Sequence, residues 1–185
     1  MGGVRQGCRE RGHDGQTLVE FALVLPMFMF LLMSLVEYGF LYNNILTVQF
    51  ASRQGVSVAA TVGGEDGADC SVLKAIEAAL QSPVNRTDVS AVEIFQSDTT
   101  GAPVTGRVNR YIRVGTLDCP GTGTQPYSLV GSEGYPQTER HDTLAEGLDL
   151  VGVHIDYTYH GITPLGAGRT WSVSDGSTLR MEPKQ

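Results

Sequence analysis

The hydrophobic positions near the N-terminus form one long uninterrupted run. Residues 21–36 carry no charge, and residues 21–50 carry a single charged side chain, Glu37. A helix needs about 20 mostly apolar residues to cross the roughly 30 Å hydrocarbon core of a bilayer. Leu, Val, Phe and Met occupy all sides of such a helix, which suits lipid better than the one-sided core of a soluble protein. The pattern predicts a membrane-spanning helix over residues 21–42.

Beyond residue 42 the apolar pattern changes to a seam with alternating spacings of four and three, which predicts that the helix continues on the far side of the membrane. The seam consists of Leu41, Ile45, Val48, Ser52, Gly55, Ala59 and Val62. The small residues Ser52, Gly55 and Ala59 allow close approach of another surface. That surface is either the chain's own domain or a neighbouring protein. Gly63 and Gly64 then predict the end of the helix.

The rest of the chain has the pattern of a small α+β module. Helical spacing predicts a helix over residues 71–81, and alternation of apolar and polar residues predicts about four antiparallel strands. These strands cover residues 89–96, 107–117, 151–159 and 169–181. Residues 118–147, rich in Gly, Pro, Thr and Ser, predict an irregular insert.

The distribution of charge sets an orientation and excludes one class of partner. The formal net charge is −7 and Lys74 and Lys184 are the only lysines, which argues against binding to nucleic acid. Arg5, Arg9 and Arg11 precede the apolar run. The positive-inside rule therefore predicts a single-pass protein with its N-terminus in the cytoplasm and its C-terminal domain outside.

A cleaved secretory signal fits this N-terminus poorly. The apolar run is longer than the usual 7–15 residues, and no small-x-small cleavage site lies at its outer edge. A different processing pattern lies at its inner edge, where Gly15 is followed by four residues and then by Glu20 and Phe21.

This inner-edge pattern resembles the prepilin-peptidase motif of type IV pilins, in particular that of the Tad branch. Residues 16–26, 36–39, 51–55 and 59–60, together with strings near the C-terminus such as residues 157–159 and 162–165, are similar to the TadE-like pseudopilin family. Ser57 departs from the family, which often has an arginine there.

The resemblance implies cleavage after Gly15, so that residues 1–15 are a cytoplasmic leader and Gln16 becomes the first residue. Residues 16–64 then form the transmembrane and extended helix, and residues 65–185 form the extracytoplasmic domain. Glu20 would lie in the first turn of the processed helix, where a carboxylate favours the partial positive charge of the N-terminus. In related pilins the equivalent acid is thought to pair with a neighbouring subunit's terminal amine.

The cysteines agree with an exported domain. Cleavage after Gly15 discards Cys8 and leaves Cys70 and Cys119 in an oxidising compartment, where a disulfide between them is expected. Two unpaired buried thiols are the alternative.

Glu37 is the one ionisable side chain within the apolar run, and two roles are open for it. Near the membrane surface its carboxylate can extend toward water, beside the interfacial Tyr38 and Tyr42. Otherwise it contacts a specific partner helix.

No motif for catalysis or for a cofactor or metal is present. His154, Asp156 and His160 alternate along one predicted strand, as on any polar sheet face. The sequence therefore predicts a non-enzymatic pseudopilin or minor pilin of a Tad-type pilus. Its expected partners are prepilin peptidase, other pilins, the assembly machinery and the lipid of the cytoplasmic membrane. The alternative function is that of a signal-anchored extracytoplasmic binding domain unrelated to a pilus.

Overall fold

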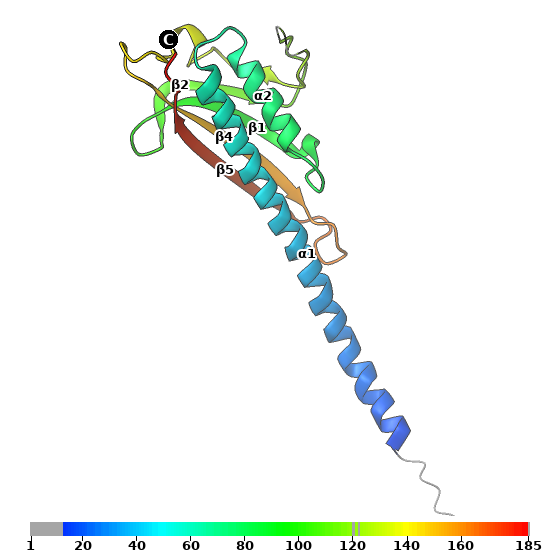
Figure 1. The fold of residues 1–185 in the computed structure, drawn as a ribbon. Coiled ribbons are helices and arrows are strands. Elements are labelled where there is room, and N and C mark those ends of the chain that lie inside the picture. Colours follow the sequence, from blue (N-terminus) through cyan, green and yellow to red (C-terminus); the bar gives the residue numbers. More distant parts are fainter. Residues whose placement is uncertain (1–12, 120, 122, 185) are drawn as a thin grey trace, which may run out of the picture.

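The computed structural model describes residues 13–119, 121 and 123–184, and it consists of one long helix with an α+β head at its C-terminal half (Figure 1). The leader arginines and Cys8 lie outside the described residues. Helix α1 (His13–Val62) runs through Pro26 and ends at Gly63, whose φ of 54° suits glycine. The predicted continuation of the helix beyond residue 42 and its predicted end before Gly63 and Gly64 are both confirmed.

The head contains a five-stranded antiparallel sheet with the order β3-β2-β1-β4-β5. The strands are β1 (Val89–Ser97), β2 (Pro103–Ile112), β3 (Ser128–Leu129), β4 (Leu150–His160) and β5 (Thr170–Arg180). The α+β class is confirmed, and the expected strand count of about four is one too low because the two-residue β3 is too short to produce an alternating pattern.

The second strand begins and ends earlier than the alternation over residues 107–117 predicts. The Asp98 carboxylate accepts hydrogen bonds from the backbone N–H groups of Thr100 (2.8 Å) and Ala102 (3.0 Å), which closes a tight turn directly before Pro103. At the other end, a backbone turn at Val114 and the positive φ of Gly115 stop the pairing with β1. Turn chemistry therefore fixes both ends of β2.

Both helices cover the same face of the sheet (Figure 1). Helix α2 (Ala68–Ala79) lies beside the second half of α1, and the core forms between these helices and the sheet. From β4 the core receives Val151, Val153, Ile155, Tyr157 and Tyr159, as its alternation predicts. From α1 it receives Val48, Ala51, Val56, Ala59 and Ala60. The second half of α1 is thus part of the head's own core.

The insert over residues 118–147 is fixed to the head although it contains little regular structure. Cys119 forms the predicted disulfide with Cys70 of α2. Two short elements lie within the insert, β3 and the 3-10 helix η2 (Gln137–Glu139). The other 3-10 helix, η1 (Arg86–Asp88), lies outside the insert and precedes β1. The side chains of Tyr127 and Tyr135 are completely buried. Because its aromatic residues face the core, the insert is a structural part of the head.

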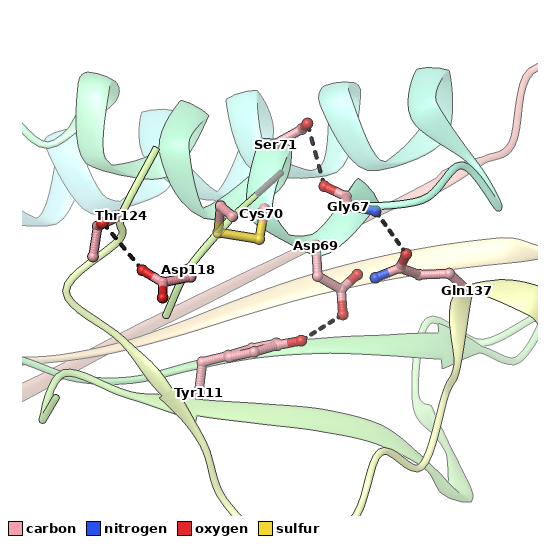
Figure 2. Close-up of a disulfide and its surroundings, with 9 residues drawn as sticks. Gly67, Asp69, Cys70, Ser71, Tyr111, Asp118, Thr124 and Gln137 are labelled. Atoms are coloured by element: carbon pink, nitrogen blue, oxygen red, sulfur yellow. Dashed lines mark hydrogen bonds between the residues drawn. A yellow bond between two sulfur atoms is a disulfide. The ribbon is translucent and has the colours of Figure 1, made fainter. Parts of the chain in front are cut away.

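A buried ion pair fixes the insert a second time. Arg140 donates from Nη2 to Asp69 Oδ1 of α2 at 2.5 Å, and both side chains are almost fully buried. Asp69 Oδ2 also accepts from the Tyr111 hydroxyl (2.7 Å) and from the Asn109 amide (2.8 Å) on β2. Figure 2 shows Asp69 and Tyr111 beside the disulfide. Burial and the nearby Asp69 carboxylate raise the pKa of Tyr111, so its hydroxyl remains a donor.

The close approach of α1 to the head depends on Gly55. A Cβ at Gly55 would lie 2.8 Å from Cγ1 of Ile76 on α2 and 3.3 Å from Cγ1 of Val153 on β4. Gly55→Val should therefore destabilise the head by about 1–3 kcal/mol through overpacking. Thermal unfolding of the detergent-solubilised protein measures this. Gly39→Val on the same helix is the control, since a Cβ there meets nothing within 4 Å; equal effects of the two variants would contradict the packing.

The disulfide should contribute substantially to the stability of the head. It closes a loop with a sequence separation of 49 residues, and removing a bridge from a small exported domain typically costs about 2–5 kcal/mol. The variant Cys70→Ser/Cys119→Ser should unfold at lower denaturant concentration than the oxidised protein. Reduction of the unsubstituted protein should give the same shift, and reduction of the variant should give none.

Candidate functional site: the free helix and its junction with the head

The first part of α1 extends away from the head (Figure 1). We call residues 16–36 the free helix. All of its side chains are exposed except Leu25, which is half-buried. Its large apolar residues include Leu23, Met27 and Leu35, which are 65–77% exposed. Within the part of the chain that the structure describes, α1 is the one helix long and apolar enough to cross a membrane.

The predicted processing residues lie together at the start of α1. The Gln16 side-chain amide donates to Glu20 Oε1 at 3.0 Å, one helical turn away. Phe21 is 63% exposed, and a Cβ at Gly15 would meet nothing within 4 Å. Gly15, Gln16, Glu20 and Phe21 are thus far from the head and accessible. Cleavage after Gly15 stays a prediction.

Glu37 marks the point where the helix meets the head, and it is only 9% exposed. Its carboxylate accepts hydrogen bonds from the Tyr159 hydroxyl (2.8 Å) and from the backbone N–H groups of Ile162 (3.2 Å) and Thr163 (2.8 Å). One of the two roles expected for Glu37 required its carboxylate to extend toward water. In the structure it does not, because the loop between β4 and β5 encloses it. Burial, together with the hydrogen bond to the Glu37 carboxylate, raises the pKa of Tyr159 to about 12. The hydroxyl therefore stays protonated and donates.

Two more polar contacts follow along the same side of α1. The Tyr157 hydroxyl donates to the Asn44 side-chain oxygen at 3.0 Å. Ser52 donates to the Asp175 carboxylate on β5 and lies 3.1 Å from the Ser177 hydroxyl. With Glu37, these residues form a polar ladder between α1 and the strands β4 and β5. Since hydrogen bonds are directional, the ladder fixes the rotation and the axial position of α1 on the head.

The residues expected to pack against another helix lie against the chain's own head. Ser52, Gly55 and Ala59 are buried there, and Glu37 is held by the β4–β5 loop. Of the two surfaces that the seam left open, the chain's own domain is the one in contact. Packing of these four residues against other pilins stays a prediction.

An exposed apolar stripe on α1 was missed in the sequence. Tyr38, Tyr42, Leu46 and Phe50 are 47–71% exposed, although they lie level with the head. Their regular spacing of four places them on one side of the helix. This spacing is visible in the sequence and could have predicted the stripe. The stripe continues the apolar surface of the free helix beyond Glu37.

The polar residues considered as metal ligands do not come together in one group of three. His154 Nε2 lies 3.3 Å from Asp156 Oδ1, and His160 Nδ1 lies 3.3 Å from Asp88 Oδ2. Among the described residues, no group of three or more His, Cys, Asp or Glu side chains has the geometry to hold a metal ion. The helix and its junction thus remain the candidate functional site.

An N-terminal helix that is free and apolar in its first half and built into an α+β head in its second half is the arrangement that the pilin resemblance implied. The model of the TadE-like protein family matches residues 15–57. The TadE-like resemblance is thereby confirmed over this segment, and the family it points to is that of Tad pilus components with an N-terminal apolar helix. Neither the curated proteins nor the solved structures contain a match to the chain.

The junction predicts a local effect for Glu37→Ala. Removing the carboxylate leaves the N–H groups of Ile162 and Thr163 without their acceptor, at a cost of about 1–3 kcal/mol. Hydrogen exchange at these two amides should therefore become faster, while the amides of β1 keep their protection. Glu20→Ala is the matched control, because Glu20 lies far from the head. Unchanged exchange at Ile162 and Thr163 would contradict the role of Glu37.

Proposed function

We propose that this protein is a pseudopilin or minor-pilin component of Tad pilus assembly. It is held in the cytoplasmic membrane by α1, with the leader inside and the head outside. Prepilin peptidase cleaves it after Gly15, and the processed helix packs against other pilins. The observation that carries this proposal is the TadE-like match, which starts at Gly15 itself and extends to residue 57, well into the second half of α1.

The two halves of α1 have different surroundings, which supports a separate role for each: membrane spanning for the first half and packing in the head for the second. The free helix has 21 residues and a length of about 32 Å at 1.5 Å per residue, close to the hydrocarbon thickness of a bilayer. The second half is occupied by the head's own core. The residues predicted to pack against other pilins, Glu37, Ser52, Gly55 and Ala59, are buried in the head of this structure. The contacts with other pilins are therefore placed instead at the free helix and at the apolar stripe of Tyr38, Tyr42, Leu46 and Phe50.

The head supplies no evident chemistry to this assembly and acts as a folded module outside the membrane. Its disulfide suits an oxidising compartment. The placement of Arg5, Arg9 and Arg11 before the free helix supports the same orientation through the positive-inside rule.

Processing is tested by the N-terminal residue and the intact mass of the protein recovered from membranes. The protein should begin at Gln16, and Gly15→Ala should block cleavage so that the leader is retained. Gly12→Ala is the matched control, a glycine of the same leader outside the motif, and should be processed normally. Recovery of an unsubstituted protein that begins at Met1 would contradict cleavage.

The alternative is a signal-anchored binding domain that never meets a pilus. Copurification of the processed full-length chain with other pilins or with the assembly machinery distinguishes the two functions. Dependence of this copurification on Glu20, with processing intact, supports the pilin-like function. Normal anchoring without any such association supports the alternative.

A further inference from the structure

Backbone hydrogen bonds fix the shape of the loop that encloses Glu37. In this β4–β5 loop (residues 161–169), Thr163 O accepts from the N–H groups of Gly166 (3.0 Å) and Ala167 (2.8 Å), and the Arg169 N–H donates to Gly166 O (2.9 Å). Gly166 approaches Glu37 so closely that a Cβ there would lie 2.6 Å from the carboxyl carbon. The loop is therefore held at a fixed height along α1.

This height coincides with the outer surface of the membrane. The free helix before Glu37 is about 32 Å long, and the head contacts α1 at Glu37. A bilayer of about 30 Å around α1 therefore ends near Glu37 and not at residue 42, where the apolar pattern predicted its edge. Figure 1 shows the loop beside α1 at the end of the head from which the free helix emerges. No other part of the head drawn there reaches as far along α1.

The exposed side chains of the loop have the character of a membrane interface. Ile162 is 56% exposed and Leu165 is 37% exposed, and Arg169 is also exposed. A groove between the loop and α1 is lined by Tyr38, Leu165, Arg169 and Trp171. Tyr and Trp are enriched at the level of lipid headgroups, and Arg attracts their phosphates.

We infer that the β4–β5 loop is a second membrane contact, which rests on the bilayer that α1 crosses. Ile162 and Leu165 enter the boundary between headgroups and acyl chains, and the Arg169 guanidinium faces lipid phosphate. Because Glu37 ties the loop to α1, this contact fixes the height and tilt of the head above the membrane. The inference rests on the membrane anchoring proposed above and requires no pilus.

The sole tryptophan of the chain, Trp171, reports this contact directly. It lines the groove next to the loop and is half-buried. The full-length protein is reconstituted into vesicles of phosphatidylethanolamine and phosphatidylglycerol. One set contains lipid brominated near the headgroup end of the acyl chain, and another contains lipid brominated near the bilayer centre. Trp171 fluorescence should be quenched by the shallow bromines and much less by the deep ones.

Serine substitutions separate insertion of the loop from mere proximity to the membrane. Ile162→Ser/Leu165→Ser should lose most of the shallow quenching, and Ile162→Ser alone should lose part of it. Leu144→Ser is the control, since Leu144 is 76% exposed on the insert, near the opposite end of the head. Its quenching should equal that of the unsubstituted protein.

Flotation of the vesicles distinguishes the two ways of failing. Protein that floats with the vesicles but shows no shallow quenching would overturn the loop contact and leave the anchor standing. Equal quenching of the double serine variant would also overturn it. Protein that does not float would overturn the anchor, and the loop contact with it.

Discussion

One continuous helix has to satisfy two surroundings, and the rest of the structure depends on how it changes from one to the other at Glu37. Before this residue α1 is apolar on all sides and free; after it, one side is buried in the head. A carboxylate at such a position is costly unless its hydrogen bonds are satisfied. One tyrosine hydroxyl and two backbone N–H groups satisfy it, and all of them come from β4 and the loop that follows. The residue at which α1 changes its surroundings is therefore bonded to the end of β4 and to the loop after it.

The head is held to α1 by two kinds of interaction with different consequences. Apolar packing around Gly55 and Ala59 supplies most of the attraction, but it depends weakly on rotation and on small axial shifts. The polar ladder at Glu37, Asn44 and Ser52 contributes less free energy, since a hydrogen bond is worth about 0.5–1.5 kcal/mol net. Its directionality selects one orientation among those that packing permits. A helix that holds a folded head in one orientation requires both.

The sequence was informative wherever a feature depends on local periodicity. The long apolar run, the seam from Leu41 to Val62 and the alternation along β4 each predicted their element, because burial repeats with the period of the helix or strand. The Cys70–Cys119 disulfide followed from cysteine parity and compartment. The family resemblance at Gly15, Glu20 and Phe21 located the candidate site.

The features that the sequence did not predict depend on contacts between distant segments. Two-residue β3 has no period to detect. The ends of β2 depend on the Asp98 turn, and the order of the insert depends on Arg140 reaching Asp69 on α2. The acceptor role of Glu37 requires a loop 125 residues further along the chain. A carboxylate near a membrane surface carries no local signal that distinguishes a solvated side chain from one enclosed by its own domain.

The apolar stripe on α1 is covered only in part by the head. Tyr38, Tyr42, Leu46 and Phe50 are 47–71% exposed, and leaving large apolar side chains in water costs about 25 cal/mol per Å² of apolar surface. Leu46 and Phe50 line a groove with Ala78 and Ala79 of α2, and Tyr38 lines one with Leu165 of the β4–β5 loop, so each groove leaves room for further apolar contacts. In the proposed assembly a second apolar helix covers the stripe and the free helix together, since the two form one continuous surface.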